Sequence, residues 1–386
     1  MWRKLTQVVS VLGLVLSLVA SVTAHEQLPL DSPRPAVDIA ILLDTSNSMD
    51  GLIDQARGQL WTIVNEFAAA KKHGLTPHLR VALFEYGNTN LPASEGYIRQ
   101  VAPLTDDLDE VSEALFALTT RGGDEYCGQV IDEAVTRLDW SREPNAYRAI
   151  FIAGNEPFTQ GPVNYQRACA YAIQHGIIVN TIHCGDYQTG VDGMWAHGAQ
   201  LGEGRYLNIN HDQAVVHIDA PQDPELIRLN AELNTTYIWY GRKGRVAGLR
   251  QSAQDENAAL FGGANVAQRA ASKASGVYQL ADADLVDALS LGEVDLQTLP
   301  EDDLPEALRG MTEDERRAYI ESQAHQRARI RANINALASE REAFVAAERV
   351  KLANQTGDTL GDVIVTAVQE QLKEAGFSIA DEKQQP

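Results

Sequence analysis

The chain has 386 residues and a formal net charge of −21 at pH 7. This length exceeds one typical domain of about 100–200 residues, so we expect a sizeable core with an appended region. The acidic charge repels nucleic acids and anionic lipids, and we find no glycine-rich phosphate loop and no basic nucleic-acid patch, so nucleotide and nucleic-acid binding are not expected. The three cysteines are too few for a disulfide-stapled scaffold.

The first 24 residues predict a secretory signal peptide. Arg3 and Lys4 form a positive start, Val8–Val22 is an apolar stretch, and the small residue Ala24 ends it. A membrane anchor is the alternative, because the apolar run approaches the roughly 18 residues that a span needs, but the small-residue exit favours cleavage after Ala24. No later segment is apolar enough to span a bilayer. We therefore expect a periplasmic or secreted protein, not integral to the membrane after cleavage, with a linker at 25–36.

From residue 37 onward, apolar patterns predict an α/β domain. Val37–Leu43 is a nearly continuous apolar run, typical of a parallel strand covered on both faces, and Leu52–Lys71 has helical spacing. Further strands are expected at 79–86, 148–153, 177–184 and 204–208, and further helices at 108–118, 130–138 and 165–175. This alternation predicts a doubly wound, mostly parallel sheet in a domain at 37–217, which closes near His217.

Beyond His217 the pattern changes to a largely helical C-terminal region. A capping box at Thr312 begins a long amphipathic helix, and a second helix ends at Gly376. The expected segments are a mixed, mainly helical extension at 218–299, an acidic, proline-bounded linker at 300–311, a long helical hairpin at 312–376 and a polar tail at 377–386. The hairpin either packs on itself or docks on the main domain, or it forms a coiled-coil arm that binds a partner.

The first predicted strand runs directly into Asp44, Ser46 and Ser48, which alternate along a turn. This Asp-x-Ser-x-Ser pattern resembles the metal-ion-dependent adhesion site of von Willebrand factor A domains, and the resemblance extends to about His217. It implies a Rossmann-like sheet with a divalent cation, Mg²⁺ first and Mn²⁺ or Ca²⁺ as alternatives, held by these hard oxygen ligands. The alternative is a helix cap, in which Ser48 accepts backbone N–H groups.

In that family two further loops complete the metal site, and this chain departs from the pattern in both. One loop offers Asp124 and Glu125 where the family usually has a threonine. The other aligns so that Gly154 stands where an aspartate is expected, followed by Asn155 and Glu156. Our hypothesis is that the carboxylate has moved: Asp124 or Glu125 coordinates the ion, and Asn155 or Glu156 assists. The competing hypothesis is a degenerate site that holds no metal.

By resemblance, the chain looks like a non-enzymatic, metal-dependent protein-binding module, whose bound ion accepts a carboxylate from a partner. A structural or envelope-interaction role carried by the C-terminal helices is the alternative. A thiol enzyme using Cys127, or Cys184 with His183, is less favoured, because adjacent residues on a strand point to opposite faces. Cys127 and Cys184 either form a disulfide or are separate packing residues, and Cys169 is the third cysteine.

Overall fold

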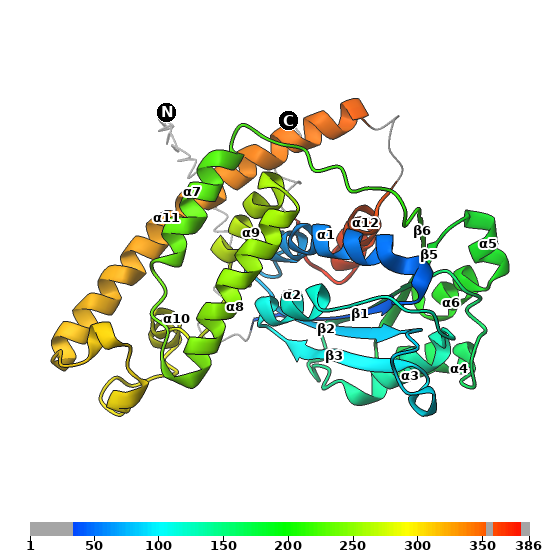
Figure 1. Cartoon of the computed structure of the whole chain (residues 1–386), viewed down its shortest axis with the longest axis horizontal. Helices are drawn as coiled ribbons and strands as arrows, with labels where there is room; N and C mark the ends of the chain where they lie inside the picture. Colours follow the sequence, from blue (N-terminus) through cyan, green and yellow to red (C-terminus); the bar gives the residue numbers. More distant parts are fainter. Residues whose placement is uncertain (1–33, 353–357, 380–386) are drawn as a thin grey trace, which may run out of the picture. The chain divides into compact units, whose positions relative to one another are not determined.

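The computed structural model describes residues 34–352 and 358–379, which contain a six-stranded sheet flanked by helices (Figure 1). The predicted signal peptide, residues 25–33 and most of the polar tail lie outside the described residues. The strand order is β3-β2-β1-β4-β5-β6, and every neighbouring pair is parallel except β2 with β3. The strands are β1 (Ala36–Asp44), β2 (His78–Tyr86), β3 (Ile98–Thr105), β4 (Tyr147–Gly154), β5 (Ile178–Cys184) and β6 (Glu203–Ile209). The predicted doubly wound, mostly parallel sheet is confirmed.

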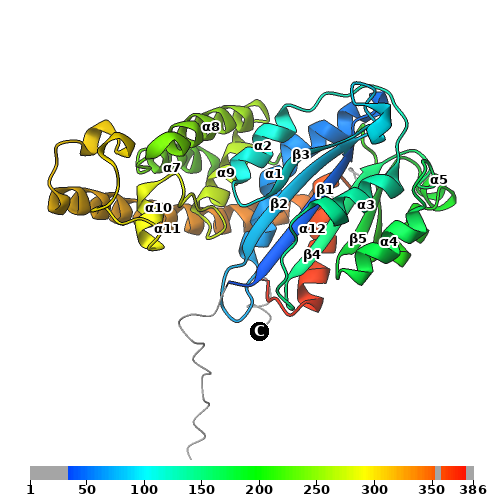
Figure 2. The same cartoon turned by 90° about the horizontal axis from the view of Figure 1, so that it is seen from below.

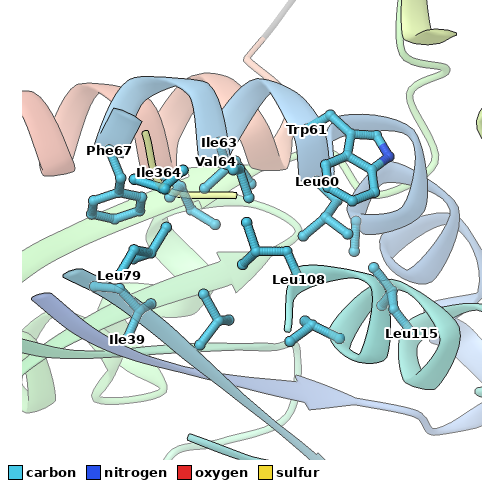
Figure 3. Packing of buried hydrophobic residues seen from close by; sticks show 14 of the residues in the cluster. Ile39, Leu60, Trp61, Ile63, Val64, Phe67, Leu79, Leu108, Leu115 and Ile364 are labelled. Carbon is cyan, nitrogen blue, oxygen red and sulfur yellow. The ribbon is translucent and has the colours of Figure 1, made fainter. Parts of the chain in front are cut away.

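Successive side chains of β1 enter two separate cores, one on each face of the sheet. Val37, Ile39 and Leu43 belong to one buried apolar cluster, and Ala40 and Leu42 belong to the other. The first core lies beneath α1 (Asp50–Ala69), α2 (Leu108–Phe116) and α12 (Leu360–Glu374), and Figure 3 shows part of it. The second lies beneath α3 (Cys127–Arg137), α4 (Tyr165–Gln174) and α6 (Trp195–Leu201), and the short α5 (Tyr187–Asp192) follows β5. Because both faces are covered, β1 is apolar almost throughout.

The antiparallel edge strand β3 was not predicted from the sequence. Arg99, Gln100 and Pro103 interrupt its apolar pattern, and only two of its residues, Ile98 and Ala102, are buried. A proline is tolerated there because β3 has a neighbour on one side only. Sequence periodicity is weak in such a strand, since most of its side chains do not enter a core.

The two predicted C-terminal helices are present as α11 (Glu313–Leu352) and α12, but they do not form a self-packed hairpin. α12 packs against α1 (Figures 1 and 2) and lies beside β6. Gln371 of α12 accepts a hydrogen bond from the Tyr147 hydroxyl at 2.6 Å and donates one to Asn180 Oδ1 at 2.7 Å, which ties the helix to β4 and β5. Docking on the main domain, one of the alternatives, is therefore the arrangement of this helix, and the sheet's cover is not complete at His217.

A helical extension occupies the chain between β6 and α11. Its helices are α7 (Asp223–Asn234), α8 (Gly241–Leu260), α9 (Gly263–Ala274) and α10 (Leu285–Ser290), followed by 3₁₀ turns at Glu301–Asp303 and Glu306–Leu308. α9 packs on α1, and α8 packs on α2. Buried Arg269 of α9 donates to Asp109 of α2 at 2.6 Å and lies 4.6 Å above the ring of Trp61 of α1. Within the described ranges, no helix has the length and apolarity needed to cross a bilayer.

Candidate metal centre

The predicted site residues come from three loops at the carboxyl edge of the sheet, where ligands of open α/β sheets bind. Asp44 is the last residue of β1, and Ser46 and Ser48 follow in the turn that contains a 3₁₀ helix, Asn47–Met49. Glu125 stands two residues before α3, and Asn155 follows the end of β4. Strand register brings these ends together, because Asp44 pairs with Tyr86 of β2, and Leu43 pairs with Ala153 of β4.

Asp44 is fully buried, and only one of its two oxygens has a hydrogen-bond partner. Its Oδ1 accepts from the backbone N–H of Ser46 at 2.7 Å, whereas Oδ2 has none among the described residues. Burial raises the pKa of Asp44 to about 7; hydrogen bonds from Ser46 oppose the rise, and the negative charge of Glu156 adds to it. In the metal-free protein this carboxyl group therefore holds a proton up to about neutral pH.

Glu125 is the second buried carboxyl group of the site, with 5% of its surface exposed. Burial and then the charge of Asp44 raise the pKa of Glu125 to about 8, and its Oε2 is a buried atom without a partner in the described part of the chain. A Cβ atom added to Gly87 would lie 2.7 Å from Glu125 Cγ and 2.9 Å from Asp44 Oδ1. Both acidic side chains thus converge over Gly87, and its positive φ of 80° also favours glycine there.

Ser46, Ser48 and Asn155 complete the group of oxygen-bearing side chains. The two serine hydroxyls lie 3.4 Å apart, and the amide nitrogen of Asn155 donates to Ser48 Oγ at 3.2 Å. Asn155 Oδ1 is buried and has no hydrogen-bond partner among the described residues. The helix-cap alternative for Ser48 is wrong, because the N-cap of α1 is Met49 and no side chain caps that helix.

Asp124 and Glu156, the other two candidate ligands, lie at the exposed rim instead. Asp124 accepts a hydrogen bond from the Tyr126 hydroxyl at 3.1 Å, and Glu156 accepts one from Gln160 at 3.3 Å. Each loop therefore contributes one residue to the interior of the site and one acid to its rim. The loop backbone decides which of two neighbouring residues points inward, and the sequence alone left that choice open.

Gly154, where the resemblance expects an aspartate, has no room for a side chain. A Cβ atom there would collide with the hydroxyl group of Tyr86 and lie 3.2 Å from Asp44 Oδ2. The Tyr86 hydroxyl is fully buried and donates to the carbonyl oxygen of Ala153 at 2.9 Å. Sequence reasoning missed Tyr86; its only signal was an aromatic residue at the end of a buried strand.

The donors at this centre fit a hard divalent cation. Two carboxylates, two hydroxyls and one amide oxygen come together, and oxygen ligands of this kind suit Mg²⁺, Mn²⁺ or Ca²⁺. Asp44 Oδ2, Glu125 Oε2 and Asn155 Oδ1 are buried without hydrogen-bond partners within residues 34–352 and 358–379, a costly arrangement that a cation would relieve. In the same ranges no three His, Cys, Asp or Glu residues are grouped to hold a metal, so the hydroxyl and amide oxygens are essential to such a site.

The cysteines do not form the disulfide that was one of the alternatives. Cys127, Cys169 and Cys184 are buried free thiols. Burial raises the pKa of all three well above the ordinary value, so they are neutral thiols rather than reactive thiolates. His183 interacts with the carbonyl oxygen of Asn155 at 3.3 Å and not with a thiol. This geometry does not favour a thiol enzyme.

Comparison with known protein families matches residues 38–192 to the von Willebrand factor type A domain. Solved structures similar to this chain include BatB from Bacteroides thetaiotaomicron, with 18% identity over 45% of this chain and 90% of that chain and a TM-score of 0.34. An aerotolerance-related membrane protein from Bacteroides fragilis has 16% identity over 46% of this chain and 94% of that one, with a TM-score of 0.32. Proximal thread matrix protein 1 from the mussel byssus, with a zinc-occupied MIDAS motif, has 14% identity over 47% of this chain and 43% of that one, with a TM-score of 0.35. No curated protein matches the chain.

Proposed function

Because residues 38–192 form a von Willebrand factor type A domain, we propose that this chain is a protein-binding module that acts through a divalent cation. Domains of this family commonly mediate protein interactions. The ion's ligands would be Asp44, Ser46, Ser48, Glu125 and Asn155. Asp124 and Glu156 would act from the rim, through their charge or through water.

One observation carries this proposal: two buried carboxyl groups, Asp44 and Glu125, share the site, and each has an oxygen without a hydrogen-bond partner among the described residues. Two buried carboxylates without a cation repel each other and lose hydration, so one or both must take up a proton. A divalent ion removes both costs because its charge balances the two carboxylates. A degenerate site kept only for packing would gain nothing from retaining two buried acids.

When bound, the ion would supply a positive centre at the sheet edge with coordination positions open to a partner's oxygen atom. Mg²⁺ is our first choice, and Mn²⁺ and Ca²⁺ accept the same donors. Glu125 would take over the negative charge that the family places on the third loop, the one that follows β4. In this chain Gly154 stands at that position and is packed against the Tyr86 hydroxyl, so no acidic side chain fits there. The proposed export of the protein, to the periplasm or outside the cell, rests on residues 1–24.

We further infer that α12 belongs to the sheet domain and that the helical extension is an insertion before it. The apolar face of α12 is buried against the first core, with Val363, Ile364 and Val368 nearly inaccessible. A partner-binding arm would need that face to be free. This packing argues for recognition at the metal face rather than through a C-terminal hairpin.

Thermal unfolding tests the metal site. The protein is melted in EDTA and in millimolar Mg²⁺, Mn²⁺ or Ca²⁺, beside Asp44→Ala and the control Asp54→Ala, which removes an exposed acid of α1. An ion at a hundredfold its dissociation constant should stabilise the wild type and the control by about 2.7 kcal/mol and leave Asp44→Ala unchanged. No shift with any of the three ions would refute the proposal.

A further inference from the structure

We propose that the partner recognised at this metal face is basic: it pairs Lys or Arg side chains with Glu156 and Asp124 and completes the ion's shell with a neutral oxygen, not a carboxylate. This inference rests on the proposed function and names the chemistry of its partner. It departs from the carboxylate that the family resemblance implies.

The charge inside the site disfavours a carboxylate from a partner. Asp44 and Glu125 together carry two negative charges, which already balance a divalent ion. Here a third carboxylate from a partner would have to lose its hydration without a net positive charge to receive it. A carbonyl, amide or hydroxyl oxygen avoids that cost.

The rim of the site carries two further negative charges, Asp124 and Glu156. Glu156 lies close enough for its negative charge to act on both Asp44 and Glu125, and Asp124 acts on Glu125 in the same way. These two exposed acids come from two different loops. Gln160, which donates to Glu156 at 3.3 Å, also accepts from the backbone N–H of Glu125 at 3.2 Å, and Asp124 is the residue before Glu125. An approaching carboxylate would be repelled by both acids, whereas a cationic side chain would be attracted.

Neither rim acid is neutralised within the described parts of the chain. Glu156 accepts from the neutral amide of Gln160, and Asp124 from the neutral hydroxyl of Tyr126. None of the ion pairs between described residues involves either of them, although many other exposed acids have Arg or Lys partners, such as Glu225 with Arg228. The two rim charges are therefore available to a partner. The chain's net charge of −21 adds a long-range attraction for basic proteins.

The partner preference is testable with two synthetic nine-residue peptides. The basic peptide has a central Asn flanked by Lys, and the acidic peptide has a central Asp flanked by Glu. Each is labelled, and its binding is measured by fluorescence anisotropy with protein loaded with the ion that gives the thermal shift. The protein variants are Asp124→Asn/Glu156→Gln and a matched control, Glu306→Gln/Asp314→Asn, which removes one exposed acid from the 3₁₀ turn Glu306–Leu308 and one from α11.

The basic peptide should bind the wild type and the control equally, and the rim variant about tenfold more weakly or worse, while the acidic peptide should not bind. The rim variant is measured at an ion concentration that saturates its own thermal shift, so a loss of peptide binding is not a loss of metal. Tighter binding of the acidic peptide, no binding of the basic peptide at millimolar concentration, or equal binding by the rim variant would overturn the inference. Absence of a metal-induced shift in the wild type would instead refute the proposed function.

Discussion

In the absence of a divalent ion, Asp44→Asn should make the folded protein more stable at alkaline pH. Asp44 Oδ1 accepts from the Ser46 backbone, a bond that the asparagine carbonyl can keep. The amide nitrogen would then take the position of Oδ2, which has no hydrogen-bond partner among the described residues. The substitution removes a buried charge and adds a donor where the wild type has none.

The size of the effect follows from the pKa of Asp44. Burial raises it from 3.8 to about 7 in the folded protein. Well below pH 4 the group is protonated in both folded and unfolded states, so it contributes no difference. Between about pH 4 and pH 7 the unfolded state releases the proton while the folded state keeps it, so the free energy of unfolding falls across this range and levels off above pH 7. At about 1.4 kcal/mol per pKa unit the loss reaches about 4 kcal/mol above pH 8, which Asp44→Asn should recover. For a unit of about 350 residues this corresponds to roughly 5 °C in Tm.

Thermal melts in EDTA at pH 5 and pH 8.5 provide the assay, with Asp38→Asn as the control. Asp38 is also a buried aspartate of β1, but both its oxygens are hydrogen-bonded, to Arg80 and to the backbone of Ser141. The control should lose stability at both pH values because it breaks a satisfied ion pair. The reasoning is refuted if Asp44→Asn melts at or below the wild-type temperature at pH 8.5, or if its gain is the same at pH 5.

Three further outcomes follow from the described contacts. Binding of the preferred ion at pH 6.5 should release more than one proton per protein, because Asp44 and Glu125 have pKa values of about 7 and 8 without metal. Calorimetry in buffers of different ionisation enthalpy measures the number of protons, and release of less than one would contradict a site shared by both carboxyl groups. Gln371→Ala should cost about 1–3 kcal/mol in urea unfolding, since the buried Tyr147 hydroxyl loses its acceptor; no loss would mean that α12 is not docked. Arg269→Ala should cost about 3–5 kcal/mol in the same assay, because it removes the ion-pair partner of buried Asp109 in α2 and one of the two partners of Asp255 in α8. A loss below about 1 kcal/mol would contradict this.

The central strands of the sheet were predictable because they carry their own apolar signal. β1 is covered on both faces, so nearly every residue from Val37 to Leu43 is apolar and the run is visible without any knowledge of its neighbours. The apolar face of α12 was equally visible, but its packing partner was not. Gln371 meets Asn180 across 191 residues of sequence, and an amphipathic pattern records that a face is buried without recording what buries it.

For the candidate site, the sequence narrowed the possible metal ligands in each of the two later loops to a pair of adjacent residues, but it could not choose between the two. Asp124 and Glu125 are adjacent acidic residues, and either could supply a carboxylate ligand. Only Glu125 turns toward Asp44, over the space that Gly87 leaves open. The same holds for Asn155 and Glu156. In the loop after β4, the family motif drew attention to Gly154 as the position of a missing aspartate. The sequence could not show that a side chain there would collide with the Tyr86 hydroxyl, because that collision depends on the pairing of β1 with β2, which no local pattern reports.

The position of the second carboxylate determines which part of the chain responds to the ion. If the second carboxylate ligand lay on the third loop, the ion would connect the ends of β1 and β4, which are neighbouring strands of the sheet. Glu125 instead stands before α3, so an ion would join the β1 loop to the segment 117–126, which has no regular secondary structure. Without the ion, repulsion between the carboxyl groups of Asp44 and Glu125 opposes their approach, and such a segment opens more readily than a central strand. We therefore expect ion binding to slow hydrogen exchange at the Glu125 amide, which donates to Gln160 at 3.2 Å; slowing confined to the third loop would place the second charge elsewhere.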